Sequence, residues 1–195
     1  MRKKSICLSL LISLFTHNLH AKENKFEAFG DLFKLMPLYV AIATISIQDW
    51  KGLLQLALGT LATQLTSEGI KSLDAYIADR GHQNAMLWAR RPGFNDFKGM
   101  PSGHSAGAFS GAAFVYYRYG WKAAIAPIVL ATLTAASRVQ AKKHSILQVS
   151  IGAGIAWGFA YLFTAPYKSN LWISPIFEKD SQGGDKVGMS LSYQF

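Results

Sequence analysis

The sequence predicts an all-α, integral-membrane helical bundle of about five helices, preceded by an N-terminal signal sequence or anchor. Half of the 195 residues are hydrophobic and only 16% are charged, whereas ordinary soluble domains contain about 25% charged residues. This hydrophobicity excludes intrinsic disorder, and the single cysteine excludes a disulfide framework or a cysteine-based zinc site. The net charge of +9 predicts an anionic partner, but the long apolar segments argue against a nucleic-acid-binding protein.

Residues 1–21 have the pattern of a signal peptide or signal anchor. Three basic residues at positions 2–4 precede an apolar segment over residues 6–15, and Ala21 supplies a small residue for cleavage. Cys7 lies inside the apolar segment and is interpreted as a small hydrophobic residue. The segment therefore predicts export of the chain that follows it, whether it is cleaved or retained.

Five apolar segments within residues 22–167 are the expected helices of the membrane domain. A spanning helix needs about 20 mostly apolar residues, and only the last segment reaches that length by itself. The others need flanking residues or lysine and arginine ends that extend to the interface. Five such segments behind an export signal favour a membrane bundle. They cover residues 35–48, 52–67, 105–117, 123–137 and 145–167.

Residues 168–195 form a separate C-terminal tail, for which the pattern predicts a short β-hairpin. Apolar residues from position 187 to 195 alternate with other residues, which is typical of a strand. Residues 171–177 supply the second strand, and residues 181–185 have the composition of a turn.

The two longer polar stretches between helices, residues 71–102 and 138–144, are predicted to face the periplasm. Counting crossings from an exported N-terminus places both stretches on the outer side. The positive-inside rule conflicts with this in part, because the first stretch holds several basic residues. We give more weight to the signal, since outward-facing basic residues are suited to binding an anion.

Anion-binding groups gather at helix ends in these two stretches. Ser102 and Gly103 precede an expected helix, whose N-terminal N–H groups and dipole favour an anion. Glycine also lets the backbone approach a ligand closely. Lys71, Arg91 and Arg138 add three cations, two of which are guanidinium groups suited to phosphate oxygens.

Two histidines, His104 and His144, accompany these groups, each just before or at the start of an expected helix. An imidazole can act as a nucleophile or as a proton donor. An anion site beside two imidazoles is what phosphoryl transfer needs when no metal takes part.

These residues form four motifs in a fixed order: Lys71, Arg91-Pro92, Pro101-Ser102-Gly103-His104 and Ser137-Arg138-x5-His144. The set resembles the type-2 phosphatidic acid phosphatase superfamily, which also contains acid phosphatases and vanadium haloperoxidases. The resemblance covers roughly residues 71–148 and, within the superfamily, is closest in pattern to bacterial lipid A phosphatases.

The resemblance implies a helical phosphatase domain over residues 22–167 that acts on a lipid at the periplasmic face of the bacterial inner membrane, without a metal or another cofactor. It implies that His144 is the nucleophile, which forms a phosphohistidine. His104 protonates the leaving alkoxide and then activates water. The residues that the resemblance assigns to phosphate binding are Lys71, Arg91, Ser102, Gly103 and Arg138.

The lysine motif departs from the superfamily pattern. The usual lysine stands seven residues before the motif arginine, where this sequence has Asn84. Lys71, twenty residues before Arg91, takes its place in our interpretation, because some bacterial lipid A phosphatases have a similarly long interval. Glu68 lies one turn before Lys71 and is placed to pair with it.

The residue four positions after His144 is the second departure, because Gln148 stands where the superfamily has Asp. That Asp accepts a hydrogen bond from Nδ1–H of the nucleophile. The Gln148 side-chain carbonyl can accept this bond but cannot supply the charge. Gln148 is therefore the candidate that orients His144, and a backbone carbonyl, Asp74 or Asp96 are the alternatives.

A lipid phosphatase is the preferred function, with lipid A as the preferred substrate. Undecaprenyl pyrophosphate and phosphatidylglycerophosphate are alternative substrates, and transfer of the phosphate to another lipid is an alternative outcome. A non-catalytic binder of anionic lipids is supported only by Gln148, and a binder would not need two positioned histidines. A channel or transporter predicts charged residues inside the spans, and these segments have none away from their ends.

Overall fold

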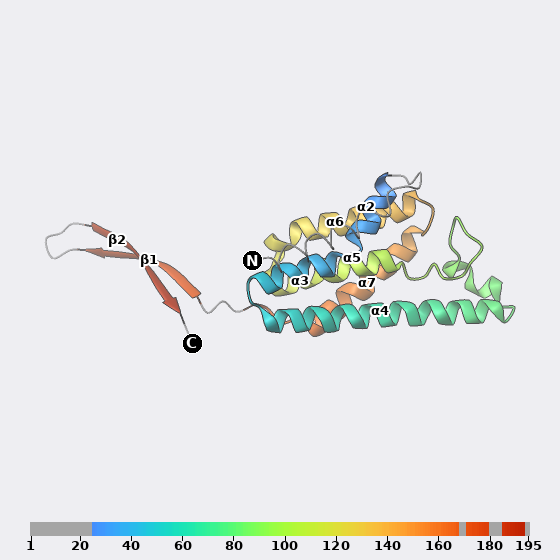
Figure 1. Ribbon diagram of the computed structural model, residues 1–195, viewed down its shortest axis with the longest axis horizontal. Coiled ribbons are helices and arrows are strands. Elements are labelled where there is room, and N and C mark those ends of the chain that lie inside the picture. The colour runs from blue at the N-terminus through green and yellow to red at the C-terminus, as the bar shows by residue number, and fades with distance from the viewer. Residues whose placement is uncertain (1–24, 168–170, 180–184, 194–195) are drawn as a thin grey trace, which may run out of the picture. The chain divides into compact units, whose positions relative to one another are not determined.

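The computed structural model describes residues 25–167, 171–179 and 185–193. Contacts within the chain divide it into two units, with the boundary after Ala165. The elements in chain order are α2 (Lys25–Phe33), α3 (Met36–Ser46), α4 (Trp50–Asp79), the 3-10 segment η1 (Gln83–Ala89), α5 (Gly103–Tyr119), α6 (Trp121–Gln140), α7 (Ile146–Phe163), β1 (Leu171–Lys179) and β2 (Asp185–Tyr193) (Figure 1).

Each of the five apolar segments falls in a helix, α3 to α7 in order. The sequence did not predict α2 or η1. Helix α2 is nine residues long and carries lysine, glutamate and aspartate among its apolar residues, so it contains no long apolar run. The predicted signal segment, residues 1–21, lies outside the described residues.

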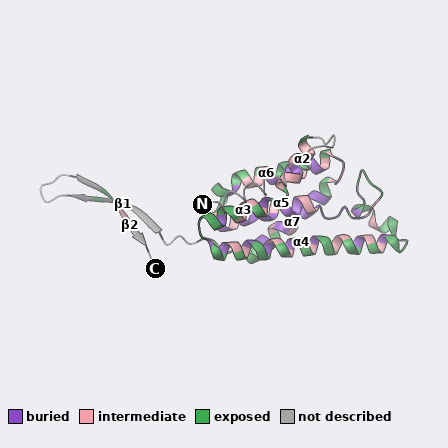
Figure 2. Cartoon of the chain, in the orientation of Figure 1, coloured by how far each residue is buried: buried purple, intermediate pink, exposed green. Residues whose placement is uncertain are grey.

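Helix α5 is the central helix of the first unit, and it packs against α3, α4, α6 and α7. Eleven of its 17 residues are buried, and most of these are alanine, glycine or serine. Small side chains let neighbouring helix backbones approach closely. In Figure 2 buried residues lie on the helix faces turned toward the middle of the bundle, and exposed residues lie on its outside. The abundance of small residues therefore reflects the position of α5 at the centre.

Membrane crossing is supported by length and composition for part of the bundle. Within the described residues, α6 and α7 are long and apolar enough to cross a membrane, and α2 with α3 would form a third span bent by 47°. The sequence predicted about five crossing helices. The difference has a physical origin, because α5 is only 17 residues long and sits inside the bundle, while the 30 residues of α4 include many polar side chains.

The outer surfaces of the crossing helices carry large apolar side chains. On α6, Ile125 and Val129 are more than half exposed, as are Tyr161 and Leu162 near the end of α7. Extended apolar surface of this kind marks a membrane or protein contact. It fits a protein embedded in lipid.

A buried ion pair fixes one end of the bundle. Arg118, in the last turn of α5, donates two hydrogen bonds to Asp49, with Nε 2.7 Å from Oδ2 and Nη2 2.5 Å from Oδ1. Its Nη1 donates to the Ala165 carbonyl at 2.8 Å, and the Tyr119 hydroxyl donates to Asp49 at 2.9 Å. Asp49 also caps α4 by accepting from the Gly52 N–H at 2.9 Å. This cluster joins the start of α4 to the ends of α5 and α7.

The second unit contains the two strands, which pair antiparallel from Leu171 opposite Tyr193 to Lys179 opposite Asp185. The sequence predicted strands in these two stretches. The turn predicted at residues 181–185 and the terminal Phe195 lie largely outside the described residues. Residue 185 itself begins β2.

Candidate active site

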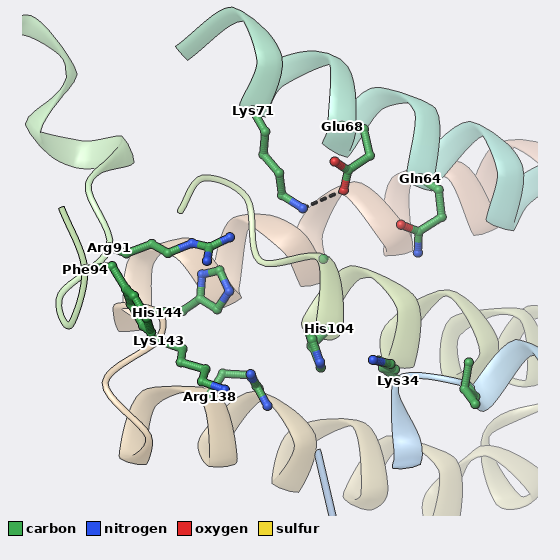
Figure 3. A pocket seen from close by; sticks show the side chains of 12 residues that line it. Lys34, Gln64, Glu68, Lys71, Arg91, Phe94, His104, Arg138, Lys143 and His144 are labelled. Atoms are coloured by element: carbon green, nitrogen blue, oxygen red, sulfur yellow. Dashed lines mark hydrogen bonds and ion pairs between the residues drawn. The ribbon is translucent and has the colours of Figure 1, made fainter. Parts of the chain in front are cut away.

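A cavity of about 610 Å³ opens at the other end of α5, where α4, α5 and α6 meet the loops before α5 and α7. Figure 3 shows Lys71 and Arg91 extending toward the space in which the rings of His104 and His144 lie. Five lysine and arginine side chains, two histidines and one carboxylate line the cavity, so cations outnumber carboxylates among its lining residues. The lining residues are Lys34, Leu35, Gln64, Glu68, Lys71, Arg91, Phe94, Gly103, His104, Arg138, Lys143 and His144.

The start of α5 forms one wall of the cavity. Ser102 is the N-cap residue, and its hydroxyl accepts from the Ser105 N–H at 3.5 Å. Gly103 follows, and a Cβ atom at this position would lie 2.9 Å from Nζ of Lys71. The absence of a side chain therefore lets the lysine ammonium approach the positive end of α5, where N–H groups are available to an anion.

Lys71 reaches the cavity from α4, and Arg91 reaches it from the loop after η1. The Lys71 ammonium lies 2.6 Å from the Glu68 carboxylate, as the sequence suggested. The Arg91 guanidinium lies 3.3 Å from the Asp96 carboxylate. Asp96 thus pairs with a cation of the site.

Arg138 enters from the last turn of α6, and its side chain is only 4% exposed. Its Nη1 is 3.3 Å from Oδ1 of Asp31, and its Nη2 is 3.9 Å from Oε1 of Glu27. Both carboxylates belong to α2. The guanidinium is therefore held at the cavity wall by charged groups of a helix that the sequence did not predict.

His144 is buried in the loop between α6 and α7, and its Nδ1 lies 2.9 Å from the Gly99 carbonyl. A carbonyl only accepts, so this contact places the hydrogen on Nδ1 and leaves a lone pair on Nε2. Burial, together with the cations Arg91 and Arg138, lowers the pKa of His144 from 6.5 to about 4, although hydrogen bonds with the Gly99 carbonyl and the Gln148 side chain act in the opposite direction. The ring is neutral at pH 7, as a nucleophile requires.

Gln148 connects the loops around His144. Its side-chain amide donates to the carbonyls of Trp88 at 3.0 Å and Arg90 at 2.9 Å. Its Oε1 accepts from the Ser145 N–H at 3.1 Å, which completes the capping box of α7. Gly99 packs directly on this amide, because a Cβ there would lie 2.7 Å from Nε2. The Nδ1 contact of His144 is thus made by a backbone carbonyl that rests on Gln148.

His104 is the second residue of α5, and its Nε2 lies 2.6 Å from Oδ1 of Asp31. Burial is the main cause that lowers the pKa of His104 from 6.5 to about 4, and the cations Arg138 and Lys34 lower it further. The hydrogen bond and the charge of Asp31 act in the opposite direction. The two histidines therefore differ in their partners, since His144 faces a carbonyl and His104 faces a carboxylate.

The structure brings most of the predicted site residues to one cavity. Ser102 and Gln148 do not line it, because both are fully buried behind its wall, where their side chains form hydrogen bonds with backbone groups. The predicted residues that do line it are Lys71, Arg91, Gly103, His104, Arg138 and His144.

Several residues at the cavity were missed by the sequence reasoning. Asp31 and Lys34 lie outside every motif, in or beside a helix that has no apolar run. Lys143 was not among the predicted phosphate-binding residues, but it lines the cavity and pairs with Glu27 of α2. Its position directly before His144 was the one available signal.

No group of three or more histidine, cysteine, aspartate or glutamate side chains is arranged to hold a metal ion within the part of the chain that the structure describes. The charged groups of the cavity are instead lysine, arginine and histidine side chains, each with one or two carboxylate partners where the structure gives an ion pair.

Comparison with known proteins agrees with the site. Residues 52–172, more than half of the chain, match the PAP2 superfamily. The chain belongs to the PAP2 superfamily. The lipid A 4'-phosphatase of Helicobacter pylori is 43% identical over 196 residues, which cover 98% of each chain. This confirms the predicted superfamily and enzyme class, a phosphoric monoester hydrolase.

A solved structure shows that this PAP2 chain shares its fold with a further protein. The crystal structure of LpxE from Aquifex aeolicus is 17% identical, with a TM-score of 0.54, and the likeness covers 77% of this chain and 92% of that one. At this identity the likeness concerns the fold alone. It confirms a helical architecture for the domain.

Proposed function

We propose that this protein is a lipid A phosphatase that removes the 4'-phosphate through a phosphohistidine on His144, at the periplasmic face of the bacterial inner membrane. The observation that supports this reaction is that two histidines and the motif cations line one cavity. The substrate rests on the name of the Helicobacter pylori relative, which aligns along nearly the whole chain.

In the first step, the Nε2 lone pair of His144 attacks the phosphorus atom, and the bond from phosphorus to the sugar oxygen breaks. His104 gives a proton to that oxygen, so the sugar leaves as an alcohol. The product is a phosphohistidine whose Nδ1–H is held by the Gly99 carbonyl. This bond stabilises the positive charge that the ring acquires.

In the second step, water attacks the phosphorus atom of the phosphohistidine. Neutral His104 takes one proton from the water, and the bond from phosphorus to Nε2 breaks. Inorganic phosphate leaves, His144 is neutral again and His104 is again protonated. The two steps balance with water as the one added reactant.

The cations around the cavity stabilise the charge that builds up on the phosphoryl oxygens. Arg91 and Arg138 offer planar guanidinium groups, and Lys71 places an ammonium beside the start of α5. Fixed donors of this kind supply most of the rate enhancement in phosphoryl transfer, because the reaction is driven by positioning and charge stabilisation.

The test uses the full chain purified in detergent. We expect phosphate release from lipid A that persists in EDTA and disappears in His144→Ala. Undecaprenyl pyrophosphate and phosphatidylglycerophosphate are offered in parallel, and a higher kcat/KM on either one would overturn the choice of lipid A. Release that is unchanged in His144→Ala would overturn the mechanism, and binding of lipid A without release would indicate the non-catalytic alternative.

Transfer to a second lipid is distinguished in the same assay. Labelled phosphate is followed into inorganic phosphate and into the lipid fraction after an acceptor lipid is added. We expect the label in inorganic phosphate, whereas label in the acceptor lipid would identify a phosphotransferase.

The orientation is tested with cysteine labelling in intact cells. In a Cys7→Ser background, Gln83→Cys marks the site end and Lys122→Cys marks the opposite end, and both positions are exposed. A maleimide that enters the periplasm but cannot cross the inner membrane should label Gln83→Cys and leave Lys122→Cys unlabelled. The reverse pattern would place the site in the cytoplasm.

A further inference from the structure

Asp31 is the one carboxylate that lies within ion-pair distance of a histidine ring in the described residues, and the histidine is His104. Its Oδ1 is 2.6 Å from Nε2 of His104 and 3.3 Å from Nη1 of Arg138. No motif marks Asp31, and it precedes the region matched by the PAP2 superfamily, residues 52–172.

The position of Asp31 is set by the packing of α2 against α6. Gly30, the residue before it, is buried, and a Cβ atom there would collide with the hydroxyl of Ser137. One turn earlier, Glu27 pairs with Lys143 and approaches Arg138. Helix α2 is thus held against the site by a close backbone approach and by ion pairs on either side of Gly30.

The other charged groups near His104 are mostly cations. Arg138 of α6 and Lys34 after α2 both disfavour a proton on the ring. From α4, Lys71 faces the start of α5 with its partner Glu68, and Arg91 and His144 line the same cavity. In this setting a proton donor needs a negative partner, and Asp31 is the carboxylate in direct contact.

The distribution of partners separates the roles of the two histidines. A nucleophile must be neutral, and the partner of His144 is an uncharged carbonyl. An acid must be protonated, and the partner of His104 is a carboxylate, which stabilises an imidazolium. A phosphate dianion in the cavity adds to this stabilisation.

We propose that Asp31 is a positioning residue that holds His104 as the protonated acid for the departing oxygen of the substrate. The inference rests on the proposed function, because it assigns His104 the proton that the alkoxide receives. Asp31 acts through His104, so its removal matters most when the leaving group needs that proton.

The experiment compares two substrates that differ in this need. p-Nitrophenyl phosphate has a good leaving group that departs without a proton, whereas an alkyl phosphate or lipid A has a poor one. In Asp31→Asn we expect kcat/KM, which reports the step in which the leaving group departs, to fall by about 10- to 100-fold on the poor leaving group, since general acid catalysis contributes about 100-fold or more. On p-nitrophenyl phosphate we expect a change within about 3-fold.

A pH profile gives a second readout that a merely structural role would not move. With the alkyl substrate, the alkaline limb of kcat for Asp31→Asn should shift to lower pH by about one unit, because one opposite charge shifts a nearby pKa by about 1–3 units. Asp31→Glu restores the charge and should recover part of the rate. The affinity of inorganic phosphate reports whether the cavity is intact in each variant.

Glu27→Gln is the matched control. It removes a carboxylate from the same helix, one turn away, that contacts Arg138 and Lys143 rather than His104. Any effect of Glu27→Gln should be equal on the two substrates. If Asp31→Asn also loses rate equally on both, or loses none, the proposal for Asp31 is overturned.

Failure of the proposed function has a different signature. If the wild-type protein releases phosphate from neither substrate, the phosphatase assignment itself falls, and the role of Asp31 falls with it. If the wild type releases phosphate but Asp31→Asn loses rate equally on both substrates, the Asp31 proposal alone is overturned.

Discussion

A buried arginine lies near each end of α5, Arg118 in α5 itself and Arg138 in the neighbouring α6, but the two have different surroundings. At the far end, Arg118 and Asp49 have side chains only 5% and 4% exposed, and their charges match one to one. At the cavity end, Arg138 is as buried but meets its carboxylates at 3.3 Å and 3.9 Å, beside four other cations of the cavity. Close pairing at one end stabilises the fold, and an excess of cations at the other end prepares a place for an anion.

The same contrast appears in the titrating groups. Burial alone would raise the pKa of Asp49, but hydrogen bonds from Arg118, the Gly52 N–H and Tyr119 outweigh it and lower that pKa. At the cavity, burial and neighbouring cations lower the pKa of both His104 and His144 to about 4. At the far end, Asp49 therefore stays charged and Arg118 compensates its charge. At the cavity end, His104 and His144 stay neutral until a phosphate binds.

Replacing the proposed nucleophile is expected to have the largest effect. His144→Ala should reduce phosphate release by roughly 10,000-fold or more, because loss of a covalent catalyst removes the whole pathway. Acid-quenched samples with labelled substrate should contain phosphohistidine in the wild type and none in the variant. Labelled protein in the variant would show that another residue is the nucleophile.

Breaking the far ion pair should affect stability and not chemistry. Arg118→Met leaves Asp49 buried without its partner, and we expect a loss of about 3–5 kcal/mol in the free energy of unfolding, measured in detergent with denaturant. The folded fraction should keep its kcat within about 3-fold. Replacing both partners, as in Asp49→Leu with Arg118→Met, should recover most of the stability, and a variant that lost activity without losing stability would contradict this contrast.

Replacing Gln148 with Asp tests whether the site can use the carboxylate that the superfamily pattern has at this position. In Gln148→Asp the shorter side chain cannot make both amide bonds to Trp88 and Arg90. We expect kcat to fall about 10-fold and stability by about 1–3 kcal/mol, since buried carbonyls lose their donors. A faster enzyme would instead show that a carboxylate at this position reaches His144 and improves on the Gly99 carbonyl.

The pH dependence of stability should show an effect only below neutral pH. Between pH 6.5 and about 4, His144 binds a proton in the unfolded chain but not in the folded protein. The free energy of unfolding should therefore decrease as the pH falls through this range, by up to about 1.4 kcal/mol per pH unit for this group. In His144→Asn the decrease should be shallower by that amount, and parallel curves for the two proteins would contradict the lowered pKa.

Local patterns in the sequence predicted the parts of the molecule that depend on neighbouring residues. Runs of apolar residues predicted α3 to α7, because the apolar side chains that mark a helix of the bundle lie within the sequence of that helix. The order of the motifs predicted the six residues that meet at the cavity, from Lys71 to His144. Three of the four motifs stand at or beside a helix end and Lys71 lies two turns before the end of α4, so a bundle of roughly known connectivity brings the motifs to one side.

The acceptor at Nδ1 of His144 shows where a local pattern is insufficient. The sequence suggested Gln148, one turn after the histidine, with a backbone carbonyl of unspecified position, Asp74 or Asp96 as alternatives. The structure gives the 2.9 Å contact to Gly99, a residue 45 positions away, and uses Gln148 to hold the loop that carries it. Which carbonyl reaches an imidazole depends on how two loops pack, and no spacing within one motif contains that information.

By itself, the sequence determined the superfamily, the helical segments and the set of phosphate-site motifs, because these follow from composition and short spacings. Only the tertiary structure decided the surroundings of each motif. It placed Asp31 of α2 beside His104 across 73 positions of the chain. It paired Arg118 with Asp49, whereas it gave Arg138 two carboxylate partners beside the other cations of the cavity. These contacts set the charge and proton positions of the site, and they arise because helix packing brings distant side chains within 3 to 4 Å in a poorly solvated interior, where one charge strongly affects the next.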